Sequence, residues 1–370
     1  MKKALIIGGG FAGCTAANML KQKGFSVTIV EKSDVLGGGC RTYFYCGHPH
    51  TYGPHHLLVN INDTHVLDYM NKYLKLRELE HYCMTFVEQD SSFYTYPIHK
   101  DEIQLMPDKE KINEEINNLP EIEPKDFEEY WKYSVGETLY NKFINKYSKK
   151  MWNVKSNKIL DEFTFSFKNK KESALKTGAK KCFDEQKTVW YPLALDGYNT
   201  YFDQCVNGCE TIFNTTVDTA DIANKKVRIK GEWITADIIV STISPDILFE
   251  YQYGELPYIG RDFLKVILPV ERITPEPYYF IHYAGDEPYT RIFEYKLLTG
   301  YKSPNTLIII ETPSFNNKLY PYPIMSEINK AKRYISELPD NVFSIGRMGK
   351  YHYDNMDVVI NDCMKLVEQL

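Results

Sequence analysis

The chain has 370 residues, with 44 Lys and Arg interspersed among 49 Asp and Glu and a formal net charge of −5. This length predicts two or three domains with a large core, and the charge pattern excludes a basic nucleic-acid-binding or membrane-surface protein. No run approaches the ~20 apolar residues that span a bilayer, and the N-terminus reads as a glycine-broken strand, not a signal peptide. We therefore expect a cytoplasmic protein with no nucleic-acid partner and no membrane insertion.

The cysteine and histidine residues form no pattern typical of a metal site. The eight cysteines are scattered along the chain without a C-x-x-C pair, which indicates reduced thiols. Residues 48–56 include four histidines, but no acid or cysteine is interleaved with them. We expect these histidines to make loop contacts, and we predict no metal.

The beginning of the chain reads as strand, turn, helix and strand. Residues 4–7 are an apolar run typical of a buried parallel strand, and residues 14–23 have helical spacing. Residues 25–30 predict a second strand, which Glu31 closes. The turn between the first strand and the helix fits G-x-G-x-x-G, so the segment predicts a βαβ unit that binds a dinucleotide.

Each glycine of that turn has a mechanical role. Gly8 permits the tight turn, Gly10 lets backbone N–H groups approach a pyrophosphate, and Gly13 lets the helix pack on the strand. The helix N-terminus faces the phosphates with partial positive charge. An ordinary βαβ turn would not explain why an acid also ends the second strand.

Glu31 and a second glycine run point to FAD. Glu31 lies 18 residues past Gly13 and can bind the two hydroxyls of an adenosine ribose, which argues against NADP. Residues 37–39 are three further glycines, which let the chain pass close to a second part of the cofactor, and Arg41 can meet the pyrophosphate. NAD enzymes usually lack such a run, so we predict FAD.

The remaining periodicities predict a discontinuous α/β architecture. Helical spacing covers residues 64–76, 101–118 and 125–150, and a hairpin is expected over 85–96. We expect a Rossmann-like FAD-binding domain with a helical insert domain and an antiparallel β-sheet substrate domain. The expected ranges are 1–80, 197–250 and 337–370 for the FAD-binding domain, 81–160 for the helical domain, and 161–196 with 251–336 for the substrate domain.

A lysine-rich segment interrupts this pattern. Residues 168–187 contain seven lysines and three acids. One interpretation is a solvated loop or helix face, and the other is a mobile basic lid near 165–190 that closes over an anionic substrate. The sequence leaves both open.

Four further stretches carry a resemblance to a known family. They read YGPH at 52–55, EYQYGEL at 250–256, PYTRI at 288–292 and GRMGKYHYDNMD at 346–357, and Trp152 follows two lysines. In this order they resemble the UDP-galactopyranose mutase family over nearly the whole chain. The resemblance implies a flavoenzyme that interconverts the pyranose and furanose forms of a nucleotide-diphosphate sugar, UDP-galactose or a related one, for cell-surface polysaccharide synthesis.

The same resemblance implies a mechanism and a set of site residues. FAD must be reduced, and its N5 forms an adduct with the sugar when the nucleoside diphosphate departs. Arg291 and Tyr353 match residues that bind the diphosphate, and Trp152 one that walls the sugar pocket, although it could also be plain core. His55 matches the loop against the flavin. The family is often dimeric, so a homodimer is expected. The expected cofactor-binding set is Gly8, Gly10, Phe11, Ala12, Gly13, Glu31, Lys32, Gly38, Gly39, Tyr52, His55, Arg347, Asp354, Met356 and Asp357.

The chain departs from the family pattern on the substrate side. The family usually carries a second arginine on a mobile loop, whereas this chain has no arginine between Lys142 and Arg228, so Lys168 is the nearest candidate replacement. Thr312 stands where the family commonly has a tyrosine, and His282 falls near a family asparagine. These changes predict the same reaction on a nucleotide sugar that the sequence does not name.

Two other functions share the N-terminal pattern. An amine-oxidase-like FAD oxidoreductase would take hydride from its substrate and pass it to oxygen or a quinone, and a flavin-containing binding protein would catalyse nothing. The oxidoreductase gives no role to Arg291 and Tyr353.

Overall fold

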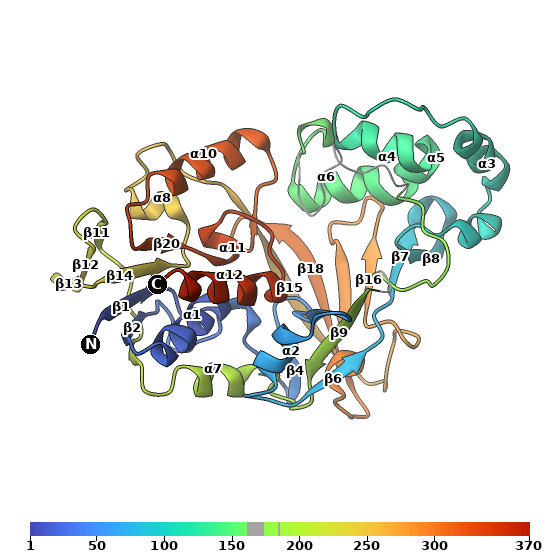
Figure 1. Cartoon of the computed structure of the whole chain (residues 1–370). Coiled ribbons are helices and arrows are strands. Elements are labelled where there is room, and N and C mark those ends of the chain that lie inside the picture. Colours follow the sequence, from blue (N-terminus) through green and yellow to red (C-terminus); the bar gives the residue numbers. More distant parts are fainter. Residues whose placement is uncertain (161–173, 184–185) are drawn as a thin grey trace.

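The computed structural model describes residues 1–160, 174–183 and 186–370. Lys168 and part of the expected lid therefore lie outside the described residues. The ribbon falls into a sheet-and-helix region that holds both termini, a tall curved sheet beside it, and a group of helices at the far end of that sheet (Figure 1).

The termini belong to a five-stranded parallel sheet in the order β10-β2-β1-β14-β20. Its central strands are almost wholly apolar and buried, as expected of parallel strands covered on both faces. Helices α1 and α12 pack together against it (Figure 1). The bounds are β1 Lys3–Ile7, α1 Phe11–Gln22, β2 Ser26–Val30, β10 Glu210–Ile212, β14 Ile238–Ser241, β20 Val342–Ser344 and α12 Met356–Glu368.

A small antiparallel meander leads into this sheet. Its middle strand pairs with both neighbours, and its buried residues Val227 and Ile229 pack with the apolar residues on one face of the parallel sheet. The meander comes directly before the buried parallel strand β14. Its strands are β11 Thr219–Asp221, β12 Lys226–Ile229 and β13 Glu232–Thr235.

The tall sheet has seven strands in the order β19-β15-β18-β17-β16-β7-β8. Neighbours are antiparallel except for β16 and β7, which run parallel. The predicted hairpin over 85–96 is present as β7 and β8, and it extends this sheet. The bounds are β7 Cys83–Val87, β8 Ser92–Tyr96, β15 Tyr258–Leu268, β16 Phe280–Tyr283, β17 Arg291–Glu294, β18 Thr306–Ser314 and β19 Tyr320–Pro321.

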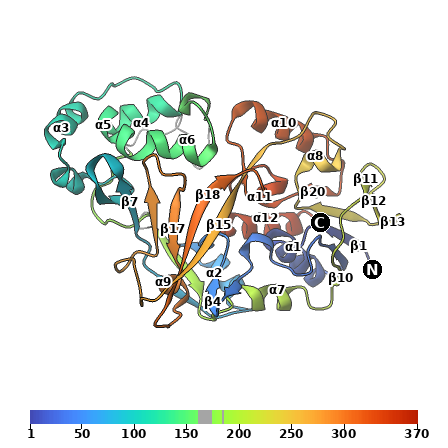
Figure 2. The same ribbon diagram turned by 180° about the vertical axis from the view of Figure 1, so that it is seen from behind.

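The helices between residues 100 and 152 pack around their own apolar core (Figure 2). The helix predicted over 125–150 is broken at Gly136, which adopts a φ of 87° and ends the first segment. Asp126 caps that segment by accepting a hydrogen bond from the Glu129 N–H at 2.9 Å. The bounds are η3 Lys100–Leu105, α3 Lys109–Asn117, α4 Phe127–Val135, α5 Glu137–Tyr140, η4 Asn141–Asn145 and α6 Lys146–Trp152.

The remaining elements connect these regions. The helix predicted over 64–76 ends at Met70, and the chain continues into strand β6, which pairs with β9 in a separate three-stranded sheet. The fold class is as predicted, while the domain boundaries stay a prediction. The other elements are η1 Gly38–Cys40, β3 Tyr43–Tyr45, β4 His48–His50, β5 Leu57–Asn60, α2 His65–Met70, β6 Leu76–Leu79, η2 Glu88–Asp90, η5 Asn157–Ile159, β9 Lys187–Pro192, α7 Asn199–Cys205, α8 Pro245–Leu248, α9 Lys296–Thr299, α10 Met325–Ser336 and α11 Gly346–Gly349.

Within the described ranges, each helix is too short or too polar to cross a bilayer.

Candidate functional site

The glycine turn after β1 is built as the sequence predicts. Gly8 has a φ of 96°, and a Cβ there would lie 2.4 Å from Thr242 Oγ1. A Cβ on Gly13 would lie 1.9 Å from the Gly8 carbonyl oxygen, so only glycine lets α1 pack this closely on the turn. A Cβ on Gly10 would meet nothing within 4 Å. Gly10 therefore faces open space where a phosphate can approach the backbone.

A cavity opens beside this turn. The N-terminus of α1 meets two glycine-containing segments there, the η1 turn and the start of α11, and Met356 adds the N-terminus of α12. Nine of the fifteen predicted cofactor residues reach its wall, namely Gly10, Phe11, Ala12, Gly39, Tyr52, His55, Arg347, Asp354 and Met356. The cavity is also lined by Thr242, Lys318, Tyr320 and Met348, which were not among the predicted cofactor residues.

The other six predicted cofactor residues are Gly8, Gly13, Glu31, Lys32, Gly38 and Asp357, and they do not line the cavity. Gly8, Gly13 and Gly38 shape the turn instead, since a Cβ on Gly38 would lie 3.3 Å from Gly10 Cα. Burial raises the pKa of Asp357, the second residue of α12.

Glu31 is buried, and its carboxylate is bonded to the chain itself. Oε2 accepts a hydrogen bond from the Gly9 N–H at 2.6 Å, and Oε1 accepts from the N–H and hydroxyl of Ser33, each at 2.8 Å. The acid thus lies at the first glycine turn, as its spacing predicts. Its role toward a ribose stays a prediction.

His55 forms one wall of the cavity. Its Nε2 lies 3.0 Å from the Tyr52 carbonyl oxygen and its Nδ1 lies 3.5 Å from Cys40 Sγ. Burial and the nearby Arg347 charge lower the pKa of His55 to about 3. The imidazole is therefore neutral at physiological pH, with one protonated and one unprotonated ring nitrogen.

Arg347 places a positive charge in the lining of the same cavity. Its guanidinium lies 4.2 Å from the centre of the Tyr353 ring and donates a hydrogen bond to the Asp354 carbonyl oxygen at 3.2 Å. The Asp354 carboxylate is buried between Lys350 and His352, at 3.0 and 2.6 Å. Burial opposes the charge of Asp354, but these two neighbours outweigh it and lower the pKa of the carboxyl.

Two arginines meet one carboxylate next to this wall. Arg291 donates from Nε and Nη2 to Glu311 at 2.8–3.1 Å, and Arg261 donates to Glu311 Oε1 at 3.1 Å. Burial acts to lower the pKa of Arg291, but Glu311 outweighs it and holds that pKa well above its usual value. Two guanidinium charges against one carboxylate leave one net positive charge in a buried position.

Tyr320 joins the two arginines to the cavity. Its hydroxyl lies 3.3 Å from Arg291 Nη2, and its ring stacks on Tyr353 with centroids 5.3 Å apart and planes at 12°. Trp152 meets the same ring edge-on at 6.2 Å. Arg291, Tyr353 and Trp152, selected from separate parts of the sequence, are thereby brought together around one tyrosine.

The two residues that depart from the family pattern on the substrate side, Thr312 and His282, lie on opposite faces of the seven-stranded sheet. Thr312 follows Glu311 on β18, so its side chain points to the opposite face from the arginine pair. His282 lies opposite Arg291 in the pairing of β16 with β17, and its ring packs at 5.3 Å from Tyr96 and 5.2 Å from Tyr147. Burial and Arg291 lower the pKa of His282 to about 3.

Fold and site together define a flavin-dependent enzyme with a buried arginine pair beside its cofactor cavity. Residues 142–353 match the family model described as UDP-galactopyranose mutase, and residues 6–73 match one for a NAD(P)-binding Rossmann-like domain. The first match covers more than half of the chain, and the chain belongs to the UDP-galactopyranose mutase family.

Two curated relatives cover the chain from end to end. A probable UDP-galactopyranose mutase of Klebsiella pneumoniae is 25% identical over 400 residues, which span 100% of this chain and 94% of the relative. A dTDP-fucopyranose mutase of Escherichia coli is 24% identical over 394 residues, spanning 100% of this chain and 98% of that protein. A solved structure of reduced UDP-galactopyranose mutase has the same fold, with a TM-score of 0.81, 17% identity, and coverage of 100% of this chain and 93% of the other.

FAD is the cofactor, and the residues present fit it. The open side of Gly10 and the N-terminus of α1 suit a pyrophosphate. The neutral His55 and the cationic Arg347, which both line the cavity, suit a ring system with polar edges.

Proposed function

We propose that this chain interconverts the pyranose and furanose forms of a nucleoside-diphosphate sugar, using reduced FAD. The observation that carries the proposal is the buried arginine pair, joined through Tyr320 to the wall of the cofactor cavity. A hydride-transferring oxidase has no need of such a charge. A reaction in which a diphosphate departs and returns does need it.

The diphosphate is proposed to bind at Arg291. This guanidinium is nine-tenths buried, so a phosphate oxygen placed there is largely shielded from water and interacts strongly with it. Glu311 holds the planar group in one orientation, and Arg261 supplies the second charge that keeps the pair cationic. Negative charge that grows on the departing diphosphate is thereby stabilised without reorganisation.

The sugar is proposed to lie between the stacked tyrosines and the flavin. When bound and reduced, FAD supplies a nucleophilic nitrogen to the anomeric carbon. Tyr353 and Trp152 exclude water from that position, which favours return of the diphosphate over hydrolysis. His55 stays neutral and keeps a polar contact available at the flavin edge.

The substrate is proposed to be UDP-galactose or a 6-deoxy relative such as dTDP-fucose, the sugars named for the two curated relatives. The cytoplasmic location, the homodimer and the role in cell-surface polysaccharide synthesis expected from the family stay predictions.

The test is a screen of UDP-, dTDP- and GDP-sugars with dithionite-reduced enzyme under nitrogen, with pyranose and furanose products separated by chromatography. The proposal predicts that at least one sugar gives an equilibrium mixture from either side, and that oxidised enzyme gives none. Turnover that requires oxygen and consumes it would instead identify an oxidase.

A further inference from the structure

A disulfide joins Cys83 to Cys182, two residues that the sequence analysis expected to be free thiols. Cys83 begins β7, and Cys182 lies in the segment 174–183, 99 residues further along the chain. Their Cα atoms are 6.2 Å apart, within the range of a disulfide. The other six cysteines are free. A single disulfide in a thiol-rich chain is typical of redox-active pairs more than of structural frameworks.

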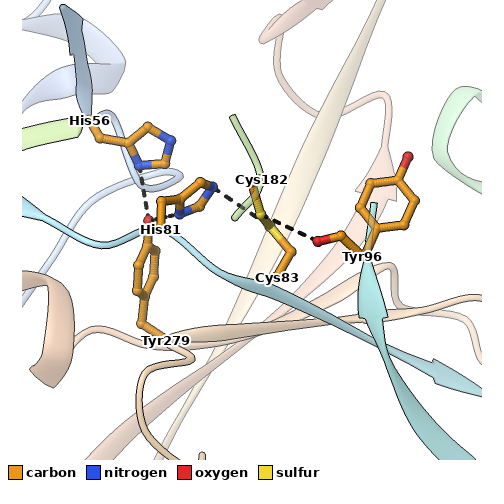
Figure 3. The surroundings of a disulfide bond; sticks show 6 residues. All are labelled: His56, His81, Cys83, Tyr96, Cys182 and Tyr279. Carbon is orange, nitrogen blue, oxygen red and sulfur yellow. Dashed lines mark hydrogen bonds between the residues drawn. A yellow bond between two sulfur atoms is a disulfide. The ribbon is translucent and has the colours of Figure 1, made fainter. Parts of the chain in front are cut away.

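Each sulfur lies beside a hydrogen-bond acceptor that a disulfide does not need. Cys83 Sγ lies 3.6 Å from His81 Nε2, and Cys182 Sγ lies 3.5 Å from the Tyr96 carbonyl oxygen (Figure 3). A disulfide has no proton to donate, but two thiols would donate one hydrogen bond to each acceptor. The surroundings therefore already satisfy the reduced form.

His81 is placed to exchange a proton with Cys83. Its other ring nitrogen, Nδ1, hydrogen-bonds the Tyr279 hydroxyl, which also lies 3.2 Å from His56 Nδ1 (Figure 3). His81 is 5% exposed, and burial together with its His56 and His282 neighbours lowers the pKa of the imidazole well below its usual value. A neutral imidazole with Nδ1–H bonded to Tyr279 presents its Nε2 lone pair to the sulfur.

The two sulfurs differ in access. Cys83 is 4% exposed, whereas Cys182 is only partly buried. An incoming thiolate can therefore attack Cys182 Sγ and expel Cys83, which is the sulfur beside His81.

The segment 174–183 also makes noncovalent contacts, since His99 Nε2 lies 3.0 Å from the Gly178 carbonyl oxygen and the Phe183 ring stacks on His81 with centroids 5.3 Å apart. The backbone of Lys176 bonds to Ile98 and Lys100, and the Cys182 N–H donates to the His81 carbonyl oxygen. Of two ion pairs, Lys181–Glu80 is exposed on both sides, where such pairs contribute little, whereas Lys180–Glu102 joins a partly exposed lysine to a buried glutamate. The disulfide is the covalent attachment of this segment.

Packed side chains connect the disulfide to the substrate side of the site. Cys83 pairs with Tyr96 across β7 and β8, and the Tyr96 ring packs on His282 at 5.3 Å. His282 in turn lies opposite Arg291. A change of position at the disulfide is thus transmitted through the packed Tyr96 and His282 rings to Arg291, the residue proposed to bind the diphosphate.

We propose that Cys83 and Cys182 form a reversible thiol–disulfide pair, served by His81, that sets the position of segment 174–183 and with it the Tyr96–His282 wall. A dithiol reductant attacks Cys182 Sγ as its thiolate, the Cys83–Cys182 bond breaks, and Cys83 leaves as a thiolate that takes a proton from solvent and then donates a hydrogen bond to His81 Nε2. The second reductant thiol then displaces Cys182, which takes the remaining proton. Two electrons and two protons pass to the protein, and the reductant becomes a disulfide.

The first measurement is differential alkylation with mass spectrometry on the folded full-length enzyme, equilibrated in reduced and oxidised dithiothreitol mixtures. The proposal predicts that only these two cysteines interconvert, reversibly, while bound FAD is retained. His81→Leu should shift the equilibrium several-fold toward the disulfide, since the Cys83 thiol loses its hydrogen-bond acceptor. Cys46→Ser, which removes an exposed free thiol, should change neither the pairing nor its rate.

Three results would overturn the pair as a redox switch. The disulfide could resist excess reductant until the protein unfolds, which would make it structural. The two thiols could stay unpaired in oxidised buffer. One zinc ion per chain, lost in Cys83→Ser, would show that His81, Cys83 and Cys182, whose ligand atoms lie within 4.8 Å of one another, bind a metal instead.

The coupling between the disulfide and the Tyr96–His282 wall rests on the proposed function and is measured separately. Binding of UDP-galactose and dTDP-fucose to the enzyme with oxidised flavin should differ several-fold between the disulfide and dithiol forms, and Cys182→Ser should match the dithiol form. Equal affinities would contradict the coupling and leave the alkylation result standing. Absence of binding in both forms would count against the proposed function.

Discussion

Arg291 shows how one side chain can be both buried and available to a ligand. Its guanidinium is held by Glu311 through three contacts, yet Arg261 shares the same carboxylate. A single arginine paired with Glu311 would be neutralised and of little use to a diphosphate. The second arginine restores the positive charge, and burial keeps it from being screened by salt.

Replacing Arg291 by alanine should lower turnover by about 100- to 1000-fold, the usual effect of removing one group that stabilises transition-state charge. The FAD content should not change, because Arg291 does not line the cofactor cavity. Steady-state kinetics with reduced enzyme and the flavin-to-protein absorbance ratio measure both. Arg228→Ala, on the exposed meander, is the matched control. Turnover within threefold of the unchanged protein would remove Arg291 from the mechanism.

The glycine turn shows how single residues shape a whole element. Gly13 lets helix α1 reach the Gly8 carbonyl oxygen, while Gly10 leaves the space for the cofactor. The two glycines therefore fail in different ways when a methyl group is added.

Gly13→Ala should destabilise the cofactor-free protein by at least about 1–3 kcal/mol, because the added Cβ overlaps the backbone of the turn. Gly10→Ala should leave that stability unchanged and weaken FAD binding, since its Cβ points into open space that the cofactor needs. Denaturant unfolding of the apo-protein and FAD titration separate the two effects. Equal stability losses in both variants would refute the assignment.

Much of the glycine turn could be predicted, because the residues that form it lie close together in the sequence. Gly8, Gly10, Gly13 and Glu31 lie within one βαβ unit, and their spacing alone places them at the turn. Tyr320 could not be found that way. It belongs to a two-residue strand, and only the pairing of β19 with β15 brings it to the cavity and beneath Arg291.

Local periodicity also misses where a helix breaks and which strands pair. The long helix predicted over 125–150 fails at Gly136, where a positive φ turns the chain between two segments. Strand β9 pairs with β5 and β6, so residues near 190 lie beside residues near 58 and 78, outside the tall sheet. Local periodicity carries no information about such partners.

At the scale of the whole molecule, several neutral histidines tie stability to pH. Burial lowers the pKa of His55, His56 and His282 to about 3, 4 and 3 in the folded protein. Their pKa values in the unfolded chain are about 6.5. Because the unfolded chain binds more protons below pH 6.5, acid favours unfolding.

We expect each of these histidines to cost up to about 2 kcal/mol of stability between pH 7 and pH 5. Thermal unfolding at pH 7, 6 and 5 should show a falling midpoint, and His56→Gln should reduce the slope. His65, which is largely exposed and whose pKa is raised by Asn361 and Asp63, is the control, since its substitution should not reduce that slope. A midpoint independent of pH over this range would mean that the buried imidazoles are protonated in the fold.

The central claim is that the flavin works without net oxidation or reduction, beside a buried cationic pocket. The most direct measurement follows flavin absorbance and furanose formation together in one anaerobic sample of reduced enzyme. The account predicts many turnovers of a nucleotide sugar while the flavin spectrum stays that of the reduced form. Reoxidation of the flavin in step with product formation would contradict it.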